Sequence, residues 1–69
     1  MQRETNPSGV NLQYILEDNE TVNAYFTSRD GKTRFGQIHQ QLRFYHFLIE
    51  SEGIAYIVHY SDIGSIEYE

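Results

Sequence analysis

The sequence predicts a mainly β fold in which an N-terminal α-helix is followed by a five-stranded, strongly bent antiparallel barrel. Three observations lead to this fold class. Apolar residues recur at helical spacing up to Leu16, and from Thr21 onward they alternate with polar residues at a spacing of two. The turn signals Asp30-Gly31 and Ser51-Glu52-Gly53 separate the alternating segments. Gly36 interrupts one segment, and a glycine within a strand is typical of the bulge or sharp bend that closes a small barrel.

The predicted helix has about two to three turns and one apolar stripe. The stripe consists of residues at i, i+3 and i+4: Leu12, Ile15 and Leu16. Pro7 suits the first helical position, with Asn6 or Ser8 as the cap, and Asn19 is a suitable stop. A helix this short is unstable in isolation, so we expect its stripe to pack on the sheet.

The rest of the chain divides into expected strands at 21–27, 32–40, 42–51, 54–60 and 63–68. In the first of them, Val22, Ala24 and Phe26 point to one face. The strands at 42–51 and 54–60 are apolar on both faces, and the last strand is expected at an edge of the sheet. One small barrel cannot bury all of this surface, so the sequence predicts pairing with further copies of the chain.

The chain has 69 residues, no cysteine and a formal net charge of −5. This length predicts a single domain, which we place at residues 9–69, after a flexible N-terminal segment at residues 1–8. A domain of this size buries only about 60% of its unfolded surface, which also favours self-association. Neither a signal peptide nor an apolar run of membrane-spanning length is present, so we expect a cytoplasmic protein with no membrane partner.

No catalytic arrangement of nucleophile and base, and no metal-ligand spacing among the three histidines, rises above chance. We therefore expect no enzyme activity, no metal and no cofactor. The acidic balance also excludes a general electrostatic attraction of nucleic acid. The basic residues are clustered, however, with Arg29, Lys32 and Arg34 on one predicted hairpin, whereas Glu17 and Asp18 end the helix.

Several short motifs along residues 10–66 resemble Hfq, the bacterial branch of the Sm-like family. The spacing from Gly31 to Gly36-Gln37-Ile38 matches the first Sm motif. Leu12 and Ile15 stand where Hfq has helix leucines, and Phe44 matches a phenylalanine after a one-residue insertion. The resemblance implies an SH3-like barrel of the Sm-like type, assembly into a homohexameric ring, and an RNA chaperone that binds single-stranded RNA in post-transcriptional regulation.

The resemblance also implies two RNA-binding faces. Tyr25 matches a tyrosine in the adenine pocket of Hfq, so one face carries an adenine site. We assign the following residues to it: Tyr25, Arg29, Gly31, Lys32, Thr33, Arg34 and Ser65. On the other face the second Sm motif lines a pore, where the candidates are Arg43, Phe44, His59, Tyr60 and Ser61. Flat aromatic side chains at both places suit stacking on bases.

Two departures from Hfq shift the expected RNA preference. The helix end, which carries arginines on the outer rim of Hfq, reads Leu16-Glu17-Asp18-Asn19 here. The second motif, Tyr-Lys-His in Hfq, reads His59-Tyr60-Ser61, so the pore has lost its lysine. We therefore expect A-rich RNA to bind better than U-rich RNA, and the annealing of paired RNAs at the rim to be poor.

The same residues allow other interpretations. Tyr25 could serve packing, the cationic hairpin could be a solvated turn, and His59 with Tyr60 could lie in a subunit interface. The main alternative function is a structural or protein-interaction module that keeps the Sm-like fold without RNA binding. A monomeric SH3-like adaptor for peptides is a third reading, which the helix and the glycine spacing disfavour.

Overall fold

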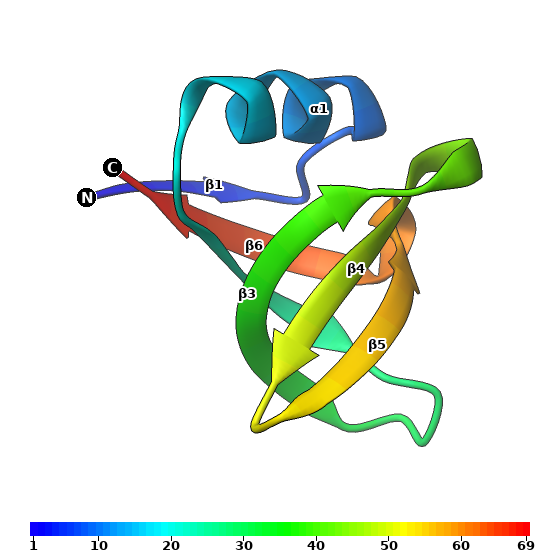
Figure 1. Ribbon diagram of the computed structural model, residues 1–69. Coiled ribbons are helices and arrows are strands. Elements are labelled where there is room, and N and C mark those ends of the chain that lie inside the picture. Colours follow the sequence, from blue (N-terminus) through cyan, green and yellow to red (C-terminus); the bar gives the residue numbers. More distant parts are fainter.

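An antiparallel sheet of six strands carries the fold, and one α-helix packs against it (Figure 1). The computed structural model describes residues 1–69. The helix is α1 (Gly9–Asp18), and the strands are β1 (Gln2–Thr5), β2 (Val22–Thr27), β3 (Thr33–Gln41), β4 (His46–Ser51), β5 (Ile54–His59) and β6 (Ile63–Tyr68). Two short 3-10 turns, η1 (Arg43–Tyr45) and η2 (Tyr60–Asp62), precede β4 and β6. The predicted mainly β class with an N-terminal helix is confirmed.

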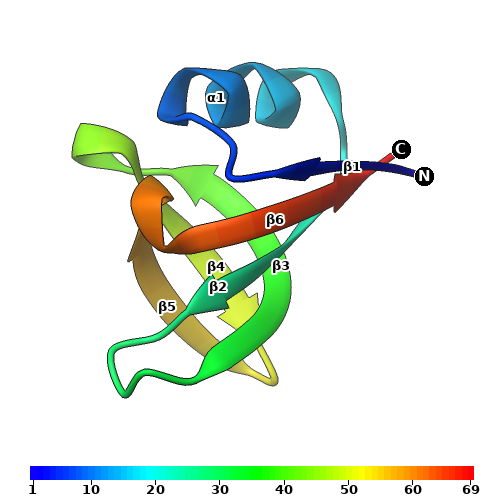
Figure 2. The ribbon, with the colours of Figure 1, turned by 180° about the vertical axis from the view of Figure 1, so that it is seen from behind.

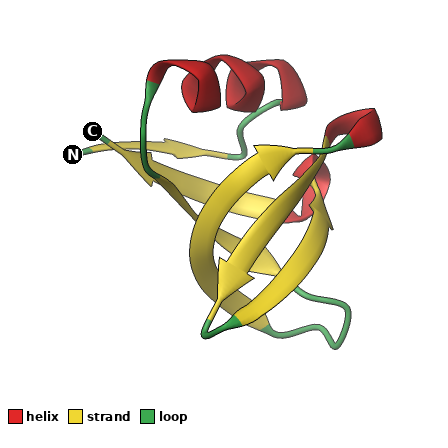
Figure 3. Ribbon diagram, viewed as in Figure 1, coloured by secondary structure: helices red, strands yellow, loops and turns green.

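The strand order is β1-β6-β2-β3-β4-β5, and every neighbouring pair is antiparallel. Because β1 and β5 each have a single neighbour, the sheet is open and has two free edges. The two chain ends lie close together, where β1 begins and β6 ends, and the view from behind shows β6 between β1 and β2 (Figure 2). The helical elements gather at one end of the molecule and the hairpin loops at the other (Figure 3).

Helix α1 follows the prediction closely. Leu12 is fully buried, and the other two residues of its stripe are half-buried against the core. Ser8 caps the helix, because its hydroxyl accepts a hydrogen bond from Asn11 N at 3.1 Å. Pro7 therefore precedes the cap instead of opening the helix. Asn19 ends the helix as expected, with its side-chain amide donating to the Ile15 carbonyl at 2.9 Å.

At residues 1–8, where a flexible segment is expected from the sequence, the structure has strand β1. Residues 2–5 pair in regular register with residues 65–68 of β6. Arg3 Nη2 lies 2.6 Å from Glu67 Oε2, and Asn6 N donates to Gly64 O at 2.7 Å. Main-chain pairing at an edge needs no apolar pattern, so a polar segment gives no periodic signal. The expectation that the last strand lies at an edge is also wrong, because the unpredicted strand β1 pairs with β6 and takes the edge position.

Strands β2 and β3 form the predicted hairpin around Asp30-Gly31, and Gly31 has a φ of +82°. Gly36 is not at a bulge, because its pairing with Ala24 is regular. A side chain there would collide with the carbonyl group of Glu50 on β4, so only glycine fits. The irregularity of β3 comes later, between residues 38 and 40, where the pairing with β4 shifts register.

The strand expected at 42–51 begins only at His46. Residues 43–45 form η1, in which Phe44 and Tyr45 have φ values of +56° and +57°. Leu42 N donates to His46 O at 2.6 Å and closes this reversal between β3 and β4. Aromatic residues favour strands by propensity, so the local sequence indicated a strand where the chain has to turn back.

The second hairpin, between β4 and β5, agrees with the sequence. Its loop consists of Glu52 and Gly53, with φ values of +52° and +80°. A two-residue loop with two positive φ values has the twist that suits antiparallel strands. Strand β5 pairs with β4 through this hairpin and has no other neighbour, so it lies at a free edge of the sheet.

The core contains ten buried apolar residues drawn from the helix and from β2 through β6. The largest fully buried side chains are those of Phe26, Phe47, Leu12, Ile49, Ile63, Ile66 and Val22. Val22, Ala24 and Phe26 alternate inward as predicted. None of the helices has the length and apolar composition that crossing a bilayer would require.

Candidate nucleic-acid interface

Tyr25 lies on the outward face of the sheet, in a row that crosses four strands. Thr5 on β1, Ser65 on β6 and Phe35 on β3 complete this row, because each is the register partner of its neighbour. The rings of Tyr25 and Phe35 have centroids 4.5 Å apart and an interplanar angle of 47°. Their side chains are 39% and 42% exposed. The two rings therefore form an accessible aromatic surface rather than part of the core.

Polar side chains surround the two rings. Thr27 and Thr33 are register partners one step along the same face, and both are exposed. On the other side of the row, Asn23 pairs with Gln37. We call the surface formed by Tyr25, Phe35, Ser65, Thr27 and Thr33 the Tyr25 face. Hydroxyl and amide groups beside exposed rings can pair with the edges of bases that stack on the rings.

Phe35 is the member of this face that sequence reasoning missed. The sequence signal that could have found it is the alternation of side chains along a strand. Gly36 and Ile38 are buried, so Phe35, between them and Thr33, points to the opposite face. Thr33 and Ser65, which were predicted for this face, do lie on it. Gly31 and Lys32 lie beyond Thr33 at the tip of the hairpin, where both are exposed.

The hairpin tip is held by hydrogen bonds to Asp30. The hydroxyl of Ser28 and the main-chain N–H of Lys32 both donate to Asp30 Oδ1, and Arg34 Nη2 lies 2.8 Å from Oδ2. Arg34 Nε also donates to Ser28 Oγ at 2.9 Å. The Ser28 hydroxyl, followed by the Lys32 N–H and the Arg34 guanidinium, lowers the pKa of Asp30 to about 2. Arg34 is therefore a structural partner of the turn.

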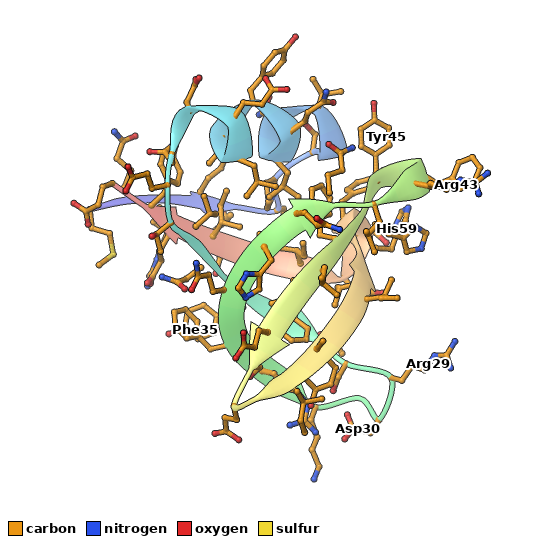
Figure 4. The ribbon with its side chains drawn as sticks, in the orientation of Figure 1. Arg29, Asp30, Phe35, Arg43, Tyr45 and His59 are labelled. Atoms are coloured by element: carbon orange, nitrogen blue, oxygen red, sulfur yellow. The ribbon has the colours of Figure 1, made fainter.

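The prediction that the three hairpin cations share the Tyr25 side is wrong for two of them. Arg34 is the register partner of the buried Phe26, so it points to the face opposite Tyr25. Its guanidinium lies 5.3 Å from the ring centroid of Tyr56. Arg29 lines the same hollow as Arg34. Figure 4 shows the Arg29 side chain on the opposite side of the molecule from Phe35. Alternation along a strand puts successive side chains on opposite faces, and residues close in sequence are thereby separated.

That hollow is a groove beside the free edge of β5. Residues 27–30 and Arg34 line one side, and residues 55–59 of β5 line the other, with a volume of about 1030 Å³. We call it the β5 groove. A second hollow of about 580 Å³ lies on the outer side of β5, between Ile57 and η1. Ile57 is 67% exposed there.

The predicted pore-side residues gather on η1, β5 and η2. The ring of His59 lies 4.6 Å from that of Tyr60 and 4.9 Å from that of His46. His59 Nδ1 accepts a hydrogen bond from Ser61 N at 3.3 Å and lies 2.8 Å from Ser61 Oγ. His59 is therefore oriented by the turn that follows it.

Arg43 and Phe44 form a separate pair on η1. The Arg43 guanidinium lies 5.4 Å from the centre of the Phe44 ring, and Phe44 is 76% exposed. The left-handed backbone of Phe44 costs on the order of 1–3 kcal/mol, and its largely exposed side chain offsets little of this by burial. No three side chains of the metal-binding types are arranged to hold a metal ion.

Comparisons of the chain with protein-family models, with curated proteins and with solved structures find no match. The features that bear on function are therefore those of the molecule itself: an exposed aromatic face, two hollows beside a free strand edge, and an uneven distribution of charge.

Proposed function

We propose that this protein is a divergent Sm-like, Hfq-related protein that binds single-stranded RNA on the Tyr25 face. The observation that carries the proposal is the exposed pair of rings, Tyr25 and Phe35, set among hydroxyl groups on the outward face of a sheet. Proteins that bind single strands use such rings to stack successive bases. The same chemistry supports A-rich RNA, because purines offer the larger stacking surface.

The order of the five predicted strands supports an Sm-like, SH3-like barrel as the fold type. Strand β6 lies beside β2, and β2, β3, β4 and β5 follow in sequence order after a short helix. Closing a sheet of this order into a barrel would bring β5 toward β6, and the β5 groove lies where that closure would occur. We place the protein in the cytoplasm.

RNA binding on this face is weakly assisted by charge. Lys32 directly precedes Thr33 of this face, while Arg34 is held by Asp30 and Arg29 lies on the other side. Stacking contributes about 1–3 kcal/mol per base, so it exceeds what a single screened cation supplies. The pore-side residues keep aromatic rings but offer Arg43 as their only side chain with a permanent positive charge.

Self-association into a closed ring, with a hexamer as the expected size, is part of the same proposal. Two strand edges are free, and β5 presents Ile54 and Ile57 to solvent. Unpaired main-chain groups along such edges favour pairing with another chain. Light scattering at tens of micromolar, on the order of usual assay concentrations, tests this part: a closed oligomer supports it, and a monomer contradicts it.

Titration with A-rich and U-rich oligonucleotides tests the RNA-binding site. We expect tighter binding of the A-rich strand, and we expect Tyr25→Ala to weaken it about tenfold or more, as the loss of one stacked base implies. Tyr14→Ala is the matched control, because Tyr14 is a 60% exposed tyrosine on the helix, away from the Tyr25 face. Equal affinity for both strands, or equal effects of the two substitutions, would contradict the assignment.

A structural or protein-interaction module is the second candidate function. It is favoured by the exposed apolar side chains of Phe44 and Ile57, which line the same hollow between η1 and β5. If the protein assembles but binds neither oligonucleotide, this candidate becomes the better account.

A further inference from the structure

Strand β1 changes which edges the molecule offers to a neighbour. Because β1 is hydrogen-bonded along β6, the last strand of the chain has no free edge. The outer edge of β1 and the outer edge of β5 are the two that remain. Any assembly by strand pairing that leaves the fold intact must use one or both of them.

The surroundings of β5 are the most basic part of an acidic chain. The chain has five lysines and arginines, and the two hollows that flank β5 contain three of them, Arg29, Arg34 and Arg43. Only Arg34 is engaged in an ion pair. The carboxylates in the hollows are Asp30, which is that ion-pair partner, and Asp62. An acidic edge therefore complements this site.

The edge at β1 has the opposite charge. Arg3 is the only lysine or arginine of β1 and β6, and it is already paired with Glu67. Glu4 on β1 and Glu69 after β6 are not in any salt bridge. A symmetric pairing of two β5 edges would bring unpaired arginines together, and a symmetric pairing of two β1 edges would bring glutamates together. Pairing of unlike edges avoids both repulsions.

We infer that β1 of one copy pairs with β5 of the next, so that the N-terminal strand is the subunit interface. This inference rests on the self-association in the proposed function and specifies its geometry. The contact joins two different surfaces, head to tail, so repetition gives a ring when the rotation closes. Four residues of β1 would supply the main-chain bonds, and Ile57, which lines the β5 groove, would lie next to the added strand.

Site-directed crosslinking tests the pairing, because the chain has no cysteine of its own. One protein carries Thr5→Cys on β1 and a second carries Ile57→Cys on β5; both positions are exposed. With a short bismaleimide we expect the mixture to crosslink at least about tenfold faster than either protein alone. Fast crosslinking of Ile57→Cys alone, or of Thr5→Cys alone, would overturn the inference in favour of a symmetric pairing. Tyr14→Cys on the helix, mixed with Ile57→Cys, measures the background.

Deletion of residues 2–5 supplies a second test, read as the mass in solution. We expect the oligomer of the intact chain to become a monomer that keeps its circular dichroism. An unchanged or larger oligomer would overturn the inference, since the neighbour would then pair with β6 itself. If the deletion unfolds the chain, the crosslinking result decides. A monomeric intact chain would contradict self-association as a whole, whereas RNA binding through Tyr25 is measured separately.

Discussion

Gly36 shows how a contact distant in sequence restricts a single residue. Its backbone is ordinary strand, yet a Cβ atom would collide with the Glu50 carbonyl on the adjacent strand. We expect Gly36→Ala to lower the free energy of unfolding by about 1–3 kcal/mol, as overpacking does. Gly64→Ala is the control, since its nearest contact would be Tyr25 O at an ordinary 3.9 Å. Equal effects in urea unfolding would contradict this explanation.

Asp30 gives the hairpin tip a dependence on pH. Its pKa is lowered to about 2, chiefly by the Ser28 hydroxyl, so the ionised form is favoured in the folded state. A carboxylate with a lowered pKa stabilises the fold above its unfolded pKa, and this contribution is lost as pH falls from about 4 through 2. We expect Asp30→Asn to destabilise the protein at pH 6 and to lose most of that effect near pH 2.

The matched control is Asp62→Asn, because Asp62 also lies in a turn but takes part in no ion pair. Thermal unfolding of the three proteins at both pH values is the measurement. An effect of Asp30→Asn that is the same at pH 6 and at pH 2 would show that its hydrogen bonds contribute nothing through ionisation.

At the scale of elements, the end of α1 lacks favourable charge. Its last turn contains no basic residue and carries Glu17 and Asp18, which are exposed. Carboxylates at a helix C-terminus oppose the helix dipole, and cations there contribute about 0.3–1 kcal/mol each. Leu16 packs on the core, so it is left unchanged in any redesign of this end.

We therefore expect Glu17→Arg combined with Asp18→Arg to raise the melting temperature and also to raise the affinity for RNA and the rate of annealing. The same two positions changed to Gln separate the removal of negative charge from the gain of positive charge. An arginine variant that assembles and melts higher but anneals no faster would favour the structural module over an RNA chaperone.

At the scale of the whole molecule, net charge limits how RNA can bind. In the proposed hexamer, six copies at −5 each would carry a formal charge of −30, so most of such a ring would repel phosphate. Each phosphate contact on a single strand contributes about 0.7 to the salt dependence of log K. If all three hairpin cations of a subunit contacted phosphates, the slope would be about 2. Two of them, Arg29 and Arg34, are turned away from the Tyr25 face, so we expect a slope of about 2 or less.

Titrations at several salt concentrations measure this slope, and Lys32→Ala should reduce it further. A slope steeper than about 4 would mean that RNA contacts cations beyond the hairpin, and the Tyr25 face would then not be the main site.

Local sequence by itself determined the helix, its stop at Asn19, the inward alternation of Val22, Ala24 and Phe26, and both hairpin turns. Each of these depends on a few neighbouring residues: caps, period, and positive φ at Gly31 or Gly53. The exposure of Tyr25 follows from the same alternation. Stacking of RNA on that ring remains a prediction.

Only the tertiary structure decided the pairing of β1, the reversal at η1 and the separation of Arg34 from Tyr25. A polar strand is stabilised by the main-chain groups of β6, which lie some sixty residues away in sequence. The chain reverses direction at Phe44 and Tyr45, although aromatic residues favour strands, because β3 and β4 pair with each other on either side of this turn. Both outcomes depend on partners that no local window contains, and for the same reason the free edge of β5 could be located only in the folded molecule.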